Sequence, residues 1–323
     1  MAELYPITEP HDRGMLDVGD GNHVYWEVVG NPGGKPAVVV HGGPGTGCTP
    51  GMRQYFDPAV YRVVLFDQRN CGRSTPRASD PATDLSTNTT RHLIADMELL
   101  RRHLGIDRWL VFGGSWGATL TFAYAEAHPE SVSEIVLSAI TNTRPSEIDW
   151  LYHGVGAIFP QEWERFRDGV PEDERDGNLV PVYNRLLNDP DPAVREKAAK
   201  DWADWELAVT SLEGGEPSPF WTDPELRYGL VRICAHYFAN NGFLDDGVLQ
   251  REAGKLAGIP GVMVHGRFDL GGPLRTAWEM SKVWPDGELV IVETGGHTSR
   301  STGMGEQIVA ATDRYARAWA GTG

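Results

Sequence analysis

A serine set among glycines is the residue whose surroundings in this sequence most clearly suggest a chemical role. The pentapeptide GGSWG, residues 113–117, has the form G-x-S-x-G and stands between an apolar run, RWLVFGG, and a helical pattern. A nucleophile elbow needs this context, because a strained strand-to-helix turn pushes the serine hydroxyl out of the chain. The start of the following helix also favours developing negative charge. A serine that only caps the helix is the alternative, but the context favours a catalytic Ser115.

A serine hydroxyl is a weak nucleophile until an oriented base removes its proton, so two further residues are needed. Hydrolases with this elbow carry an acid and then a histidine later in the chain, each after a strand. Asp269 follows the apolar run GVMVHG, and His297 lies in a glycine-rich loop after the last such run. The other candidate bases are His41, His236 and His265. Order and position favour Ser115, Asp269 and His297 as a triad.

The turn HGGPGTG, residues 41–47, follows an apolar run and resembles a phosphate-binding loop. A dinucleotide fingerprint needs G-x-G-x-x-G, and counting from Gly43 the third glycine position holds Cys48. A Walker loop needs Gly-Lys-Ser/Thr, which this sequence does not contain. In a serine hydrolase such a turn supplies one oxyanion donor, and the residue after the nucleophile supplies the other. We therefore predict that the N–H groups of Gly43 and Trp116 form an oxyanion hole.

Short apolar runs alternate with helical patterns along the chain, which predicts an α/β fold with a mostly parallel sheet. The runs that read as strands are 23–30, 37–43, 61–69, 108–114, 134–140, 261–269 and 288–296. Helices are predicted at 87–104, 117–127 and 305–320, the first with Asn88 or Thr89 near its N-cap.

Between residues 143 and 256 the sequence changes character, with five of the eleven tryptophans, many charges and no strand-like run. This stretch predicts a helical insertion over the sheet. The predicted domains are an α/β core, residues 1–141 and 257–323, and a helical cap over the active site, residues 142–256. Within the cap, residues 189–200 fit either a polar surface helix or a mobile hinge.

Composition excludes several classes of partner. The net charge of -16 disfavours nucleic acid, because no broad basic surface could displace phosphate counterions. No stretch approaches 18 consecutive apolar residues, which predicts no membrane span, and the N-terminus has no signal-peptide pattern. Three cysteines without metal-type spacing predict a reducing cytoplasm and no metal site. We expect a cytoplasmic protein without a cofactor, and the oligomeric state stays open.

Four motifs together resemble one family: HGGPG, FDQRNCGRS, GGSWGATLTFAYAEAHPE and HGRFD…GGH. They are similar to the prolyl aminopeptidase (proline iminopeptidase) family of α/β-hydrolases, from about His41 to Arg314. The resemblance implies an α/β-hydrolase fold with a helical cap, and the triad and oxyanion hole named above. Members release an N-terminal residue, typically proline, from peptides or small amides without a metal.

A carboxylate in the cap is the expected ligand of the substrate's α-ammonium. The stretch DWADWELAVT places Trp202, Trp205 and Glu206 on one helical face. The resemblance implies that Glu206 binds the amine beside Trp205, since a buried carboxylate needs a partner. A solvated glutamate beside core tryptophans is the alternative.

This sequence departs from the family pattern around the expected substrate pocket. Cys234 stands where the family has a second amine-binding glutamate, Thr141 where an aromatic is frequent, and Gly272 where a larger residue is common. Asn70 replaces a glycine. These departures argue for a pocket that differs from the standard proline pocket. A nucleophilic role for Cys234 is disfavoured, because Ser115 occupies the elbow and buried cysteines are usually inert.

The predicted function is therefore hydrolysis of an aminoacyl amide with a free α-amine through an acyl-enzyme. The substrate is a small peptide or an aminoacyl amide. Removal of another aminoacyl cap, such as alanyl, and esterase activity are the alternatives within enzymes, and Glu206 argues against an ester. A non-catalytic binding protein is a third possibility, which the complete Ser–Asp–His set disfavours. A lipid-surface role lacks any exposed amphipathic apolar stretch.

Overall fold

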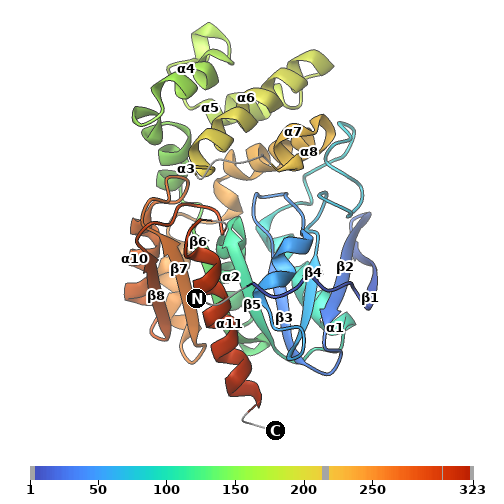
Figure 1. The fold of residues 1–323 in the computed structure, drawn as a ribbon. Helices are drawn as coiled ribbons and strands as arrows, with labels where there is room; N and C mark the ends of the chain where they lie inside the picture. Colours follow the sequence, from blue (N-terminus) through green and yellow to red (C-terminus); the bar gives the residue numbers. More distant parts are fainter. Residues whose placement is uncertain (1–3, 213–217, 300, 321–323) are drawn as a thin grey trace.

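A twisted sheet of eight strands forms the centre of the computed structural model, which describes residues 4–212, 218–299 and 301–320 (Figure 1). The strand order is β1-β2-β4-β3-β5-β6-β7-β8. The pairs β1·β2 and β2·β4 are antiparallel and the other pairs are parallel. The strands are β1 Asp12–Gly19, β2 Asn22–Gly30, β3 Lys35–Val40, β4 Tyr61–Phe66, β5 Trp109–Ser115, β6 Val132–Ile140, β7 Gly261–Gly266 and β8 Gly287–Val292.

The seven predicted strands are confirmed, and the sequence reading missed the eighth. The inner strands are almost continuously buried, as expected where helices cover both faces of a parallel sheet. The missed strand, β1, lies at the edge of the sheet and is half-buried or exposed along its length. Its sequence, DRGMLDVG, contains two glycines and only three large apolar residues, so the apolar run that marks the other strands is absent.

Helices cover both faces of the sheet, and the predicted helices at 87–104, 117–127 and 305–320 are confirmed. The α-helices are α1 Thr90–His103, α2 Trp116–Ala127, α3 Pro145–Tyr152, α4 Pro160–Asp168, α5 Leu179–Leu186, α6 Pro192–Thr210, α7 Pro219–Thr222, α8 Pro224–Phe238, α9 Val248–Glu252, α10 Leu274–Val283 and α11 Met304–Ala320. The 3-10 helices are η1 Pro50–Tyr55, η2 Pro129–Ser131, η3 Gly154–Ala157, η4 Glu172–Glu174, η5 Asn241–Phe243 and η6 Ala253–Leu256. Within the described residues, no helix has the length and apolar character needed to cross a membrane.

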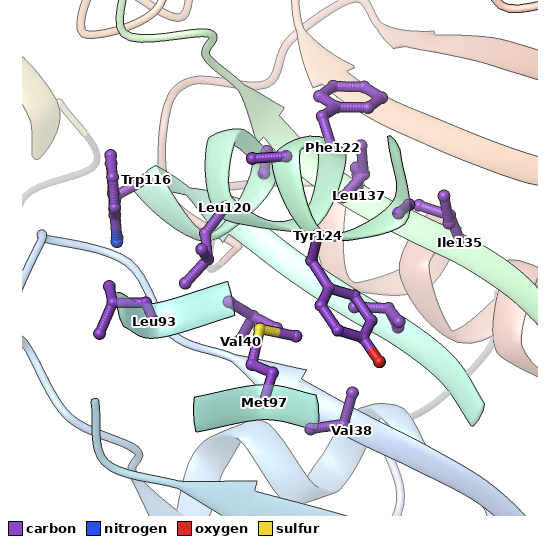
Figure 2. Close-up of a cluster of buried hydrophobic side chains, with 14 of the residues drawn as sticks. Val38, Val40, Leu93, Met97, Trp116, Leu120, Phe122, Tyr124, Ile135 and Leu137 are labelled. Carbon is purple, nitrogen blue, oxygen red and sulfur yellow. The ribbon is translucent and has the colours of Figure 1, made fainter. Parts of the chain in front are cut away.

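Alternate side chains of the inner strands enter two different apolar clusters. Val38 and Val40 of β3 pack with Leu93 and Met97 of α1 and with residues of α2 such as Leu120 (Figure 2). The intervening residues of β3 pack on the other face, against α11 and η1. Because both faces are sealed in this way, the sheet holds the strand ends rigidly with respect to one another.

The helices α3 to α8 form a layer above the carboxyl ends of the strands (Figure 1). They share an apolar cluster of their own, around Trp202 and Trp205. The predicted helical insertion is confirmed, and no strand occurs between residue 143 and residue 256 in the part that is described. Residues 192–200 belong to α6, whose first turn is capped by Asp191 accepting from the N–H of Ala193 at 2.9 Å. The helix reading of this stretch is therefore correct.

The end of the insertion returns to the sheet. Leu249 of α9 and Leu256 of η6 pack into the cluster that α2 shares with the sheet, not into the cluster of the upper helices. The predicted cap boundary at residue 256 thus stays a prediction, with α9 and η6 packed on the core.

Candidate active site

Ser115 lies at a sharp turn between β5 and α2. Its backbone has φ +57° and ψ −124°, a conformation that a serine adopts only under strain. Gly117 makes the turn possible, because a Cβ at this position would lie 2.1 Å from the carbonyl oxygen of Val40. This strand–turn–helix is the geometry of a nucleophile elbow. The hydroxyl faces a cavity under the upper helices.

Two further loops bring an acid and a base to this serine. The Nε2 atom of His297 lies 3.0 Å from the Ser115 hydroxyl oxygen. The Nδ1 atom of the same ring lies 2.8 and 2.9 Å from the two carboxylate oxygens of Asp269. With Nδ1 protonated toward the carboxylate, Nε2 carries the lone pair that can accept the serine proton. The structure therefore brings together the three residues that the sequence grouped as a triad.

Asp269 is held in its charged form. Burial alone would raise its pKa, but the rings of His297 and His265 and the N–H of Gly272 together lower the pKa below its usual value. The Gly272 N–H donates to Oδ1 at 2.7 Å. His265, a rival base in the sequence, accepts the Ile140 N–H at Nδ1 and has Nε2 at 2.9 Å from the Gly272 carbonyl. His265 thus anchors the Asp269 loop and does not reach the serine.

Gly43 and Trp116 line the same cavity as Ser115. Gly43 has φ +111°, and a Cβ there would lie 2.5 Å from the N atom of Gly45, so only glycine fits. Trp116 is the first residue of α2, and the N–H groups of a first helical turn have no partner inside the helix. Gly43 and Trp116 thus lie beside Ser115 in the wall of one cavity.

The cavity beside Ser115 is small, about 60 Å³, and Glu206 forms part of its wall. The Oε1 atom of Glu206 accepts from the hydroxyl of Tyr152 and from the indole N–H of Trp202, the latter at 2.7 Å. Burial raises the pKa of Glu206, although these two donors and the nearby His297 ring act in the opposite direction. Its Oε2 has no hydrogen-bond partner in the described part of the chain. The site therefore contains a buried carboxylate whose second oxygen, Oε2, can accept a further hydrogen bond.

The other predicted pocket residues lie at different depths. Thr141 lines the cavity and donates its hydroxyl to the Ser115 carbonyl at 2.9 Å. Gly272 lies directly behind it, since a Cβ there would come within 2.9 Å of the Thr141 methyl group. Two positions at which the sequence analysis expects a departure from the family pattern are thus neighbours in space, and both are small residues.

Trp205 and Cys234 are not in the cavity wall. The Trp205 ring stacks on Phe166, with centroids 5.6 Å apart, and its N–H donates to the Leu151 carbonyl. Cys234 is fully buried and its thiol donates to the Pro44 carbonyl at 3.2 Å. Burial, and then the nearby Glu206, raises the pKa of this thiol well above its usual value. Such a thiol is a poor nucleophile.

Sequence reasoning missed four polar residues of the cavity, Tyr152, Glu147, Thr143 and Thr210. Glu147 accepts from the N–H groups of Asn142 and Thr143 at 2.8 and 3.0 Å, in the segment between β6 and α3. An acidic residue in the first turn of a helix, after a proline, is a sequence signal that could have identified Glu147. No local pattern identifies Tyr152, because its partner Glu206 is 54 residues away.

Comparisons with known proteins agree with this geometry. A family model described as the alpha/beta hydrolase fold matches residues 35–300. A probable proline iminopeptidase of Streptomyces coelicolor is 54% identical over 97% of this chain and 98% of its own length. A proline iminopeptidase of Xylella fastidiosa is 44% identical over 98% of this chain and 100% of its own. The crystal structure of VinJ superimposes with a TM-score of 0.66 at 20% identity, covering 96% of this chain and 100% of that one, a likeness in fold.

Proposed function

The chain belongs to the proline iminopeptidase family of α/β-hydrolases, and on this premise we propose that it releases N-terminal proline from small peptides and prolyl amides. The observation that carries the proposal is the chain of contacts from Ser115 through His297 to Asp269, beside a cavity that Glu206 also lines. In this proposal Ser115 is the nucleophile, His297 the base and Asp269 the group that orients it.

The geometry supports an acyl-enzyme mechanism. As the Ser115 oxygen bonds to the substrate carbonyl carbon, His297 Nε2 takes the hydroxyl proton, and the carbonyl π electrons move to the oxygen. The N–H groups of Gly43 and Trp116 hold this oxyanion. When the C–N bond breaks, the leaving amine takes the proton from His297. Water then attacks the ester by the same route, releasing the amino acid and restoring the serine.

Glu206 is the proposed ligand of the α-ammonium. A carboxylate without a charged partner is costly to bury, and its spare Oε2 atom can accept a hydrogen bond from the substrate ammonium. The ammonium would supply the positive charge that the neutral Tyr152 and Trp202 do not. This contact explains why a free N-terminus would be required.

Proline is the proposed N-terminal residue despite the departures at Cys234, Thr141 and Gly272. Those departures argued from the sequence for a different pocket, whereas the relatives named proline iminopeptidase favour proline over the alanyl and esterase alternatives. Because Cys234 lies behind the cavity wall, its replacement of a glutamate need not change the shape of the wall.

Aminoacyl 4-nitroanilides carrying Pro, Ala, Gly or Leu, each free and N-acetylated, test the proposal on the wild type and on Ser115→Ala. We expect proline to be the preferred residue, the acetylated substrates to be refractory, and Ser115→Ala to fall by about 10⁶-fold in kcat, as when a triad nucleophile is removed. Circular dichroism checks that the variant is folded. Turnover by pure Ser115→Ala would contradict the assignment of the triad. A preference for alanine would favour the alternative in which an alanyl group is removed. Cys234→Glu, assayed on the same panel, shows whether this position affects that preference.

A further inference from the structure

Gln68, two residues after the end of β4, has a buried side chain to which the mechanism above assigns no role. Its amide Nε2 donates to the main-chain oxygen of His41 at 2.9 Å. Its Oε1 accepts from the indole N–H of Trp116 at 3.0 Å. One side chain therefore joins the two segments that carry the candidate oxyanion donors, Gly43 and Trp116.

His41 strengthens the connection on the Gly43 side. Its Nε2 accepts the backbone N–H of Gln68 at 3.0 Å, and its Nδ1 lies 2.9 Å from the Gly42 carbonyl, toward which it donates. Thr46 donates its hydroxyl to the same Gly42 carbonyl at 3.0 Å. Burial lowers the pKa of His41, so the ring stays neutral and keeps Nε2 as an acceptor. The turn that holds Gly43 is thus tied to Gln68 by side chain and main chain.

The amide of Gln68 can make its two contacts in one orientation only. A carbonyl oxygen accepts and an indole nitrogen donates, so the NH₂ group must face His41 and the oxygen must face Trp116. The Trp116 ring is itself fixed, with 1% of its surface exposed and its centroid 4.6 Å from that of Tyr237. A fixed amide between two fixed partners sets the distance between the segments.

We propose that Gln68 is a positioning residue that sets the separation of the two oxyanion donors. The inference rests on the proposed function, since it requires that the N–H groups of Gly43 and Trp116 hold a tetrahedral oxyanion. Such donors act at about 2.7–3.1 Å from the developing charge, and their alignment counts more in the transition state than in the ground state. Loss of Gln68 is therefore expected to lower kcat and to leave KM nearly unchanged.

Gln68→Leu tests the proposal, because it removes both side-chain contacts at similar volume. With prolyl 4-nitroanilide we expect kcat to fall by about 10- to 100-fold, less than the loss of a whole donor, and KM to stay within about threefold. Thermal unfolding is measured in parallel, since a purely structural role would appear there alone.

A pair of inhibitors isolates the oxyanion. The aldehyde prolinal accepts the Ser115 oxygen at its carbonyl carbon, the serine proton passes to His297, and the π electrons become an oxyanion between the two N–H groups. The alcohol prolinol keeps the ring and the amine but forms no bond. We expect Gln68→Leu to weaken binding of the aldehyde by the same factor as it lowers kcat, and to leave binding of the alcohol unchanged.

Two further variants keep the test decisive if Gln68→Leu does not fold, and a third serves as a control. Gln68→Glu keeps the contact to Trp116 but places an acceptor against the His41 carbonyl, and Trp116→Phe removes only the indole contact. Gln68→Glu and Trp116→Phe are both expected to lower the aldehyde-to-alcohol affinity ratio; where Gln68→Leu does fold, adding Trp116→Phe to it should lower the ratio little further. Ile106→Ala, a core change just before the amino end of β5, controls for lost stability and should leave the ratio unchanged.

The outcomes separate the two proposals. An unchanged ratio in the Gln68 variants, together with an inactive Ser115→Ala, overturns the positioning role and leaves the proposed function intact. A parallel loss of aldehyde and alcohol binding also overturns it, because that pattern indicates general disorder of the pocket. Turnover by Ser115→Ala removes the proposed function itself.

Discussion

The two halves of the candidate site are built in different ways. Ser115, Asp269 and His297 stand on turns that follow β5, β7 and β8, so each is placed by the strand immediately before it. Glu206 and Tyr152 come from the C-terminal part of α6 and the end of α3, and meet only because these helices pack together. The difference implies that changes in the upper helices can alter substrate preference while the residues at the strand ends keep the same reaction.

The same contrast holds for the two buried carboxylates. Asp269 faces an imidazole ring and a backbone N–H, and its pKa is lowered although burial opposes this. Glu206 accepts from the neutral donors Tyr152 and Trp202 and lies near the His297 ring, and burial raises its pKa. Asp269 is therefore charged before substrate arrives, whereas Glu206, in the proposed function, gains a charged partner from the substrate.

Among Asp269→Asn, Glu206→Gln and Trp202→Phe, Asp269→Asn should have the largest effect. It acts on the half of the site that the strand ends position. The amide leaves the geometry intact but cannot stabilise the imidazolium or hold its tautomer, so kcat for prolyl 4-nitroanilide is expected to fall by about 10⁴-fold. KM should change little, since Asp269 does not line the cavity. Asp149→Asn, an exposed change on α3, is the matched control. A loss below about tenfold would remove Asp269 from the triad.

Glu206→Gln should act on the half of the site that the upper helices contribute. It should act mainly through KM, whereas Asp269→Asn acts through kcat. Losing the charge that faces the ammonium is expected to lower kcat/KM for free-amine substrates by about 10²- to 10³-fold, chiefly through KM. N-acetylated substrates, which have no ammonium, should react at the same low rate with both proteins. Glu164→Gln, on the exposed side of α4, is the control. Equal losses on free and acetylated substrates would contradict the amine contact.

Trp202→Phe should give the smallest effect and test the electrostatics of Glu206. Burial raises the pKa of this carboxyl and the Trp202 N–H opposes the rise, so removing the donor raises the pKa further. The binding form is the ionised one, which is lost as the pH falls through the raised pKa. The acid limb of kcat/KM against pH should therefore move to higher pH.

Trp163→Phe is the control for this pH profile, because the Trp163 indole nitrogen is buried without a hydrogen-bond partner in the described structure. Its profile should match the wild type. A shift of the Trp202→Phe limb to lower pH would mean that the donor does not stabilise the charged form of Glu206.

Features made by neighbouring residues could be predicted from the sequence, whereas contacts set by packing between elements could not. The elbow at Ser115 was readable because five adjacent residues make the turn. Asp269 and His297 were readable because the carboxyl ends of parallel strands meet at one edge of a sheet. Trp205 was grouped with Glu206 by helical spacing, yet the structure turns it toward Phe166, since one face of a helix is wide enough to contact two different neighbours.

The sequence by itself determined the class of fold, the order of the reactive residues and the helical nature of the insertion, because these depend on short-range patterns of apolar residues, glycines and turns. Only the tertiary structure decided that Tyr152 meets Glu206, that Thr141 and Gly272 are neighbours, and that Gln68 joins His41 to Trp116. These contacts join residues far apart in the chain, and they arise when the helices pack on one another and on the strand ends. Packing of this kind leaves no local periodicity to read.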